Sequence, residues 1–219
     1  MTEKTANGKE EGKRVGEELI QAFIDDFEAK KGLKCVKDAH AAFPIVWFGN
    51  AEEYFRSGRR VVTVGLNPSK NEFDPEERPR FDRVDLKSPD AAETLRGTLG
   101  RYFQGETWYR KWFGRFEAIA NLAGASYMKE GTNRAIHIDA YSAIATEPTW
   151  SRLSAKDRKA ILRGGENLFR SLLDELKPKI LLFTANQDAI GEYFGDFGKP
   201  VESVRAEKAD GSLSDGVSL

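Results

Sequence analysis

The clearest candidate for chemistry is a five-residue segment that comes directly after the apolar run at residues 60–64. Its members are Gly65, Leu66, Asn67, Pro68 and Ser69. Glycine permits a tight turn and proline fixes the backbone, so the amide of Asn67 would project where a ligand could bind. The same residue types also form ordinary turns, in which Asn67 would close an Asx-turn. The segment alone leaves both interpretations open, a ligand-binding loop and a plain turn.

Polar residues also accompany the ends of two further apolar runs. Asp139 lies near the end of the run at residues 135–140, and Asn186 follows the run at residues 179–184. If the three runs are parallel strands, their carboxyl ends meet at the edge of the sheet where α/β proteins bind ligands. Residues 147–150, with the sequence Glu-Pro-Thr-Trp, either line the same pocket or form a plain turn.

Hydrophobic periodicity predicts the elements that hold these residues. After Arg60, residues 61–64 are all β-branched and Thr63 is their one polar member, which predicts a strand at residues 60–64 that is covered on both faces. Further strands are predicted at residues 135–140, 179–184 and 201–204. Helical spacing predicts helices at residues 15–32, 91–103, 109–123, 154–176 and 187–194. This alternation predicts an α/β fold with three layers, α/β/α, around a short, mostly parallel central sheet of about four strands.

Between these elements, residues 43–48 form either a short strand or a packed loop, and residues 68–90 form a long irregular loop. The chain of 219 residues is long enough for one large domain. We predict a flexible tail at residues 1–14, a single α/β domain at residues 15–206 and a polar C-terminal segment at residues 207–219.

Composition excludes several classes of site. With one cysteine, Cys35, the chain cannot form an internal disulfide or a four-thiolate metal site, and two histidines make a histidine-based metal centre unexpected. The sequence shows neither a signal peptide nor an apolar run long enough to span a membrane. We therefore expect a cytoplasmic protein without a metal, an organic cofactor or a membrane partner.

A buried strand that ends in Gly-x-Asn-Pro-small resembles the first motif of the uracil-DNA glycosylase superfamily, particularly its mismatch-specific and single-strand-selective branches. The resemblance covers roughly residues 58–204 and implies a short parallel sheet between helices. It implies that Asn67 positions the water that attacks the sugar carbon. It also implies an aromatic residue about a dozen positions later that stacks on the flipped base, for which Phe81 is the first candidate and Phe73 the second. Phe81 can equally be a core anchor for its loop.

Two departures from the family pattern concern the base and its release. Asp139 stands where the family carries an Asn that reads the base, and an ionised Asp can only accept hydrogen bonds. That change admits a base with an exocyclic amine; alternatively, Asp139 caps a backbone turn, or orients Asn67 or a water. The family also has a His-containing loop after its last strand, but no histidine follows His137 in this chain.

The net charge of −1 gives no evidence for nucleic-acid binding, so DNA contact would need a local basic patch. Residues 101–115 offer one, because aromatic residues alternate there with Arg and Lys. Trp112 within this stretch and Phe116 directly after it also fit the apolar stripe of a helix.

Three functions remain open from the sequence. The leading one is a monofunctional DNA glycosylase of base-excision repair, which flips a damaged or deaminated base, such as uracil, out of double- or single-stranded DNA. The second is an inactive module of the same fold that binds DNA, a nucleotide or a protein partner. The third is an unrelated α/β enzyme that processes nucleotides or sugars, since a fold does not fix a function.

Overall fold

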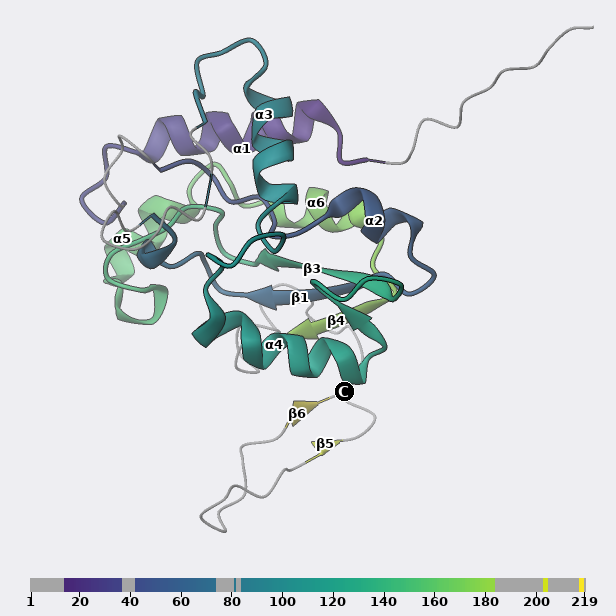
Figure 1. Cartoon of the computed structure of the whole chain (residues 1–219). Coiled ribbons are helices and arrows are strands. Elements are labelled where there is room, and N and C mark those ends of the chain that lie inside the picture. The colour runs from purple at the N-terminus through teal and green to yellow at the C-terminus, as the bar shows by residue number, and fades with distance from the viewer. Residues whose placement is uncertain are drawn as a thin grey trace, which may run out of the picture.

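The computed structural model describes residues 14–36, 42–73, 81, 84–183, 203–204 and 217–218. At its centre lies a parallel four-stranded sheet with the order β2-β3-β1-β4 (Figure 1). The strands are β1 (Val61–Gly65), β2 (Ala125–Ser126), β3 (Asn133–Asp139) and β4 (Ile180–Phe183). Strand β1 is buried along its whole length, which agrees with its β-branched sequence. The predicted α/β fold is confirmed.

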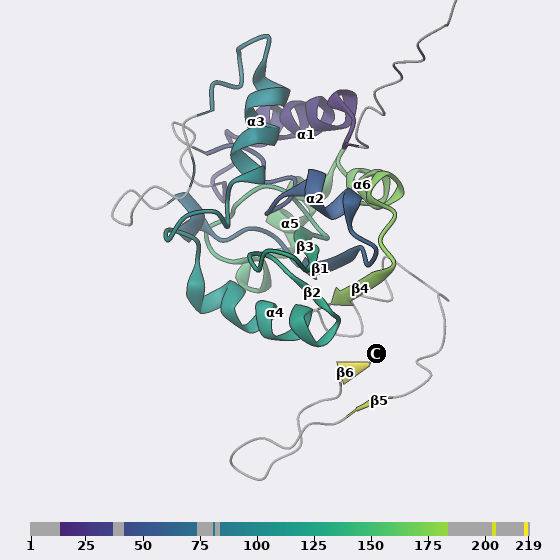
Figure 2. The same cartoon turned by 45° about the vertical axis from the view of Figure 1, so that its right-hand side comes forward.

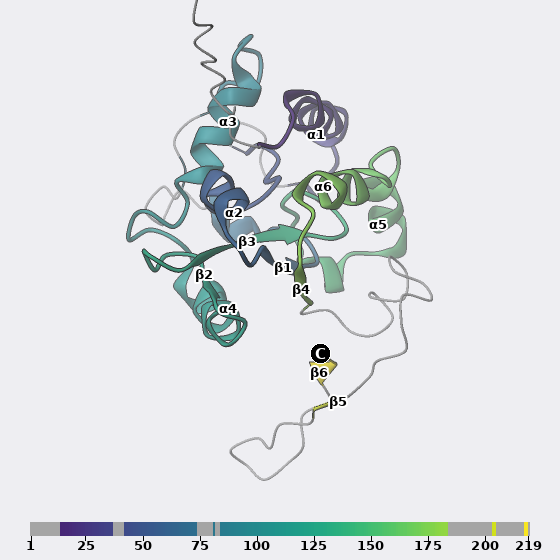
Figure 3. The same ribbon diagram turned by 90° about the vertical axis from the view of Figure 1, so that its right-hand side faces the viewer.

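Helices cover both faces of the sheet (Figures 1 and 2). On one face lie α1 (Glu17–Lys30), α2 (Ala51–Arg56), α3 (Ala91–Gly100) and α6 (Leu168–Leu176). The opposite face carries α4 (Arg110–Leu122), and α5 (Ala155–Leu162) lies beside the sheet (Figure 3). Short 3-10 turns occupy Lys70–Phe73 and Trp150–Arg152. These elements form the predicted three layers.

The fourth strand of the sheet differs from the prediction. It is β2, a two-residue strand that pairs with the start of β3. Within the predicted strand at residues 201–204, β5 (Ser203–Val204) pairs instead with β6 (Val217–Ser218) in a separate antiparallel ladder. The helix predicted at residues 187–194 lies outside the described residues.

The single helix predicted at residues 154–176 is two helices, α5 and α6, so that prediction is wrong. Gly164 has a φ of +85°, a left-handed conformation that ends α5. Gly165 then packs against α1, where an added Cβ would lie 2.9 Å from Asp26 Oδ1 and 3.1 Å from Lys30 Nζ. The break therefore comes from close packing against another helix, which hydrophobic spacing does not reveal.

The apolar segment at residues 43–48 is a packed loop that extends the sheet at one point. The backbone N–H of Phe48 donates to the His137 carbonyl (2.8 Å), and the N–H of His137 donates to the Phe48 carbonyl (3.1 Å). The Trp47 side chain is fully buried, and its indole N–H donates to the Gly49 carbonyl (3.1 Å). This loop fixes the aromatic surroundings of His137, whose ring lies 5.7 Å from that of Phe48.

The rate at which the Cys35 thiol is chemically modified should report on unfolding of the chain. Its thiol is buried, and burial followed by the nearby Asp157 carboxylate raises the pKa of Cys35. A raised pKa lowers the fraction of reactive thiolate at a given pH. We expect iodoacetamide at pH 8 to modify the native chain at least about 10²-fold more slowly than the unfolded chain, because access requires opening of the structure. Mass spectrometry at timed intervals measures this, and equal rates in both states would contradict the burial.

Candidate active site

A cavity of about 370 Å³ opens at the carboxyl ends of β1 and β3. Four members of the predicted loop line it: Leu66, Asn67, Pro68 and Ser69. Asp139, at the end of the neighbouring strand, also lines it. The structure thus brings Asn67 and Asp139 to one cavity, because β1 and β3 are adjacent and parallel, with Gly65 paired to Asp139. Asn186 lies outside the described residues.

The carboxamide of Asn67 has a defined orientation. Its Nδ2 donates to the Ile144 carbonyl (3.2 Å) and to Thr146 Oγ1 (2.9 Å). A carbonyl can only accept, so the group facing Ile144 must be the nitrogen. Thr146 agrees with this assignment, because its hydroxyl donates to the Pro148 carbonyl (3.0 Å) and can accept from Asn67.

The amide oxygen of Asn67 faces away from these partners. Among the described residues, none donates a hydrogen bond to Oδ1. The proposed Asx-turn is therefore not formed; the local turn is closed by Ser69, whose Oγ accepts from the Asn71 N–H (3.2 Å). Asn67 Oδ1 can accept a hydrogen bond from a water or a ligand in the cavity.

Gly65 lies beneath the side chains of His137 and Asp139. A Cβ at this position would lie 2.5 Å from Asp139 Oδ1 and 3.0 Å from His137 Nε2. Gly65 is the last residue of β1 and is not among the glycines with positive φ. Glycine is therefore required here by close approach of these side chains, and not by the tight turn that the sequence suggested.

Asp139 and His137 are both buried. Their side chains are 4% and 1% exposed, and Asp139 Oδ1 lies 3.7 Å from His137 Nε2. His137 also lines the cavity, and its ring contacts Phe113 and Phe116 of α4 at centroid distances of 5.1 and 5.2 Å. The cavity therefore ends at a carboxylate and an imidazole that are held rigidly by the sheet and α4.

Phe81 and Phe73 do not line the cavity among the described residues. Phe81 packs against Phe43 (5.1 Å between ring centroids), Phe73 (5.6 Å) and Tyr102 (5.1 Å). These contacts match the alternative interpretation of Phe81, a core anchor for its loop. The structure does not bring Phe81 together with Asn67 and Asp139.

Five other aromatic side chains line the cavity: Phe48, Tyr109, Trp112, Phe113 and Trp150. Trp150 belongs to the segment that the sequence marked as a possible pocket wall, and its ring stacks on Tyr141 at 4.6 Å. Trp112 was predicted within the apolar stripe of a helix, but it is 46% exposed. Its neighbour Phe113 is buried instead. Trp112 therefore presents an accessible aromatic face beside the cavity.

Sequence reasoning missed Glu72. This residue is 4% exposed and lines the cavity, and its Oε2 accepts from the Tyr102 hydroxyl (2.6 Å). The Tyr102 oxygen in turn accepts from the Tyr109 N–H (3.1 Å), which ties the start of α4 to the loop after β1. No signal in the sequence separated Glu72 from the many other charged residues of this loop.

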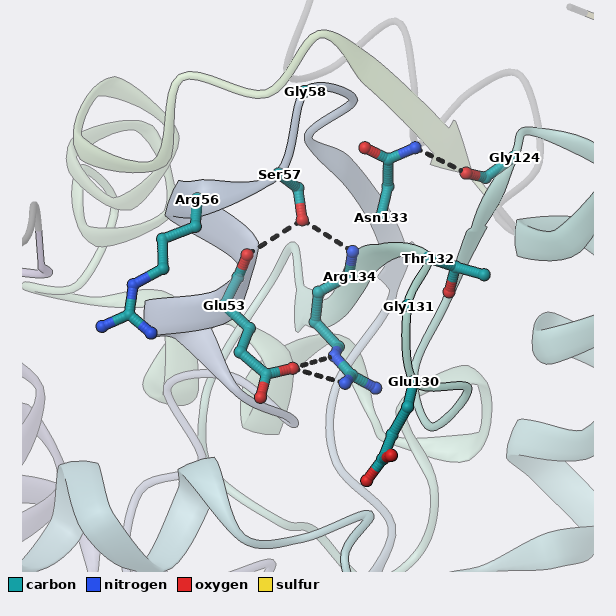
Figure 4. A pocket seen from close by; sticks show the side chains of 10 residues that line it. All are labelled: Glu53, Arg56, Ser57, Gly58, Gly124, Glu130, Gly131, Thr132, Asn133 and Arg134. Atoms are coloured by element: carbon teal, nitrogen blue, oxygen red, sulfur yellow. Dashed lines mark hydrogen bonds and ion pairs between the residues drawn. The ribbon is translucent and has the colours of Figure 1, made fainter.

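A second cavity, of about 810 Å³, lies at the opposite edge of the sheet, around the start of β3 and the end of α2 (Figure 4). Some of its polar groups already bond to one another. Arg134 Nε donates to Glu53 Oε2 (2.7 Å), and Asn133 Nδ2 donates to the Gly124 carbonyl (3.0 Å). Parallel sheets bind ligands at their carboxyl edge. The smaller cavity beside Asn67 is therefore the candidate active site.

The charged side chains that line the candidate site are acidic. Asp139 and Glu72 line it, and no lysine or arginine is among the described residues that do. Within the described ranges, no group of three or more His, Cys, Asp or Glu side chains is arranged to hold a metal ion. None of the described helices combines the length and apolar character needed to cross a membrane.

Comparison of the chain with known proteins identified no relative. No protein-family model matches the chain, no curated protein matches it, and no solved structure matches it. The chemistry of this protein has to be inferred from the cavity and the side chains that line it.

Proposed function

We propose that this protein is a DNA glycosylase that hydrolyses the N-glycosidic bond of a damaged or deaminated base. The observation that carries the proposal is the Asn67 carboxamide, which lines the cavity together with Asp139. Its nitrogen is bound to the protein, and among the described residues nothing donates to its oxygen. A carboxamide fixed in this way can accept a hydrogen bond from one water and hold it in one direction. The Gly-x-Asn-Pro resemblance to uracil-DNA glycosylases supports the same role.

The cavity suits a base that has been flipped out of the stack. Its volume of about 370 Å³ lies within the range of small-molecule sites, and aromatic rings form much of its lining. In the proposed reaction the water held by Asn67 attacks C1′ of the sugar. A bond forms between the water oxygen and C1′, the C1′–N bond breaks, and the base departs with the bonding electrons. The water gives up one proton to solvent, and the released base takes one from solvent.

The start of α4 is the proposed contact with DNA. Trp112 is 46% exposed there, next to the exposed Arg110 and Lys111. The Arg110 guanidinium lies 5.2 Å from the ring centroid of Trp108. Aromatic rings beside cations can stack on bases and neutralise phosphates. This patch supplies the local basic surface that the net charge of the chain does not.

Trp112→Ala should weaken binding of an oligonucleotide. Loss of one stacking ring costs about 1–3 kcal/mol, or about 5- to 150-fold in Kd. The fold should persist because the ring is half exposed. Leu122→Ala is the matched control, since Leu122 is 89% exposed on the same helix and does not line the cavity. Fluorescence anisotropy of a labelled single strand measures Kd; equal losses in both variants would remove Trp112 from the DNA contact.

A second candidate function is a binding module of the same fold without catalysis. The acidic lining favours it, because no described lysine or arginine in the cavity could hold a phosphate or a departing anionic base. Such a module would bind a base or nucleotide and release it unchanged.

One experiment separates the two functions. Single- and double-stranded oligonucleotides that carry uracil, hypoxanthine, xanthine or a mismatch are incubated with the protein, and abasic sites are cleaved with alkali. The glycosylase proposal expects strand cleavage at the modified base of at least one substrate. Binding of these oligonucleotides without any abasic product would select the module and overturn the glycosylase.

A further inference from the structure

A line of buried polar groups runs from the core to the cavity. The Tyr127 hydroxyl bonds to Thr63 Oγ1, and Thr63 Oγ1 lies 2.7 Å from His137 Nδ1. His137 Nε2 then faces Asp139 Oδ1 at 3.7 Å. Thr63 is fully buried and pairs with His137 across β1 and β3, and Tyr127 is 2% exposed. Adjacent strands of the sheet therefore hold Thr63, His137 and Asp139 in a fixed order, and Tyr127 directly follows β2.

The hydrogen bonds in this line have a preferred direction from donor to acceptor. Burial raises the pKa of Tyr127, so its hydroxyl stays protonated, and among the described residues Thr63 is its one acceptor. Thr63 must then place its own hydrogen elsewhere. His137 Nδ1 lies at 2.7 Å, whereas the alternative acceptor, the Ile136 carbonyl, lies at 3.5 Å. The shorter contact is the normal length of a hydroxyl hydrogen bond. Thr63 therefore donates to Nδ1.

The other side of the imidazole agrees with this direction. If Nδ1 accepts from Thr63, the ring proton of neutral His137 is on Nε2. An N–H at Nε2 faces the Asp139 carboxylate favourably, whereas a bare lone pair there would face like charge. The distance of 3.7 Å is too long for a direct hydrogen bond. Both the Nε2–H donor and the carboxylate acceptor therefore remain available to a ligand.

We infer that His137 is held as its neutral Nε2–H tautomer and that, with Asp139, it reads the lactam edge of a base, a ring N–H next to a C=O. Asp139 accepts from the ring N–H, and His137 donates to the carbonyl. Together they replace the single Asn that can do both. The ligand class is then the bases with a lactam edge, which include the deaminated bases uracil, hypoxanthine and xanthine and also thymine and guanine. This assignment rests on the proposed function for the statement that the ligand is a base in DNA.

The pair also explains how cytosine and adenine, the amino counterparts of uracil and hypoxanthine, would be refused. Cytosine and adenine carry an amine where the lactam has its C=O and a bare ring nitrogen where it has N–H. In the same pose the amine would face the His137 N–H and the ring nitrogen would face the carboxylate, which gives two repulsive contacts. A free Asn could rotate to suit either edge, but the tautomer of His137 is fixed by Thr63 and Tyr127.

The tautomer can be measured directly. The chain has two histidines, so the His40→Gln variant leaves one imidazole, and a ¹H–¹⁵N multiple-bond correlation spectrum shows which nitrogen carries the proton. We expect the ring proton of neutral His137 on Nε2. A ring protonated on Nδ1, or on both nitrogens, would overturn the inference without any need for a further variant.

Thr63→Val tests the cause, because it keeps the shape of the side chain and removes the hydroxyl. The Nδ1–H form should then appear in the spectrum. Thr98→Val is the matched control: Thr98 is also buried, and within the described structure its hydroxyl has no hydrogen-bond partner. It should leave the His137 signals unchanged. If Thr63→Val does not fold, Tyr127→Phe removes the donor to Thr63 and should also perturb the tautomer. An unchanged Nε2–H signal in folded Thr63→Val would overturn the role of Thr63.

Binding of free bases tests recognition separately from catalysis. Isothermal titration should show uracil and hypoxanthine binding at least about tenfold more tightly than cytosine and adenine, since a mismatched polar contact leaves a buried donor or acceptor unpaired. Uracil methylated at the ring nitrogen N3 should lose this advantage. Equal or weaker binding of the lactam bases overturns the inference. Preferential lactam binding without base release from any oligonucleotide leaves the inference standing and overturns the glycosylase proposal alone.

Discussion

Asn67→Ala should lower the rate of base release by about 10²- to 10³-fold, the usual cost of removing one positioned polar group from an active site. The variant loses the oxygen that holds the water but leaves the cavity and its aromatic lining in place. Binding of the oligonucleotide should therefore change little. Single-turnover release of base, measured with enzyme in excess over substrate, separates this loss from a change in affinity.

The fold of this variant should remain intact. Asn67 donates two hydrogen bonds, to Ile144 and Thr146, so its loss should cost about 1–3 kcal/mol of the free energy of unfolding. Asn121→Ala is the matched control, because Asn121 lies on the exposed surface of α4 and, within the described structure, its side chain bonds only to Glu117 of the same helix. Base release at the normal rate by folded Asn67→Ala would remove Asn67 from the mechanism.

Gly65→Ala should damage both the fold and the site. The new Cβ would lie 2.5 Å from Asp139 Oδ1, a distance that no real Cβ contact allows, so the buried carboxylate or the strand must move. Overpacking of this kind costs about 1–3 kcal/mol of the free energy of unfolding. Base release should fall as well, because the displaced carboxylate no longer faces the cavity at its normal position. Denaturant unfolding and the oligonucleotide assay measure the two effects.

Gly114→Ala makes the same chemical change where there is room. Gly114 lies in the middle of α4, and nothing lies within 4 Å of an added Cβ there. Alanine at this position should raise the free energy of unfolding by about 0.5–1 kcal/mol, because it favours the helix. If Gly65→Ala proved as stable and as active as Gly114→Ala, the close approach of Asp139 and His137 to Gly65 would be wrong.

The sequence predicted three strands of the central sheet because their apolar runs leave a clear pattern, although β4 is only partly buried among the described residues. The β-branched run of β1 and the apolar runs of β3 and β4 are typical of strands covered on both faces. Strand β2 was missed, since Ala125–Ser126 is too short to show any periodicity. The break between α5 and α6 was missed because it depends on Asp26 and Lys30 of α1, which lie far away in the sequence.

Residues of the candidate site were predictable from the sequence only where the strand topology determines the position of the side chain. Asn67 and Asp139 follow adjacent parallel strands, so their meeting follows from topology. Phe81 was placed by its spacing from Asn67, and spacing along an irregular loop does not determine where a side chain points. Helix α4 shows a similar ambiguity: Phe113 and Phe116 share one face and Trp112 and Ile119 another, both at helical spacing. Only the packed structure shows that the first pair faces the sheet.

The aromatic lining of the cavity gives the protein a built-in optical signal. Two of its four tryptophans, Trp112 and Trp150, line the cavity, whereas Trp47 is fully buried in the core. A nucleobase that entered would stack near two indoles and quench their emission, while Trp47 would provide a constant background. Occupancy of the cavity is then measurable in unlabelled protein from the decrease in tryptophan fluorescence as each ligand is added.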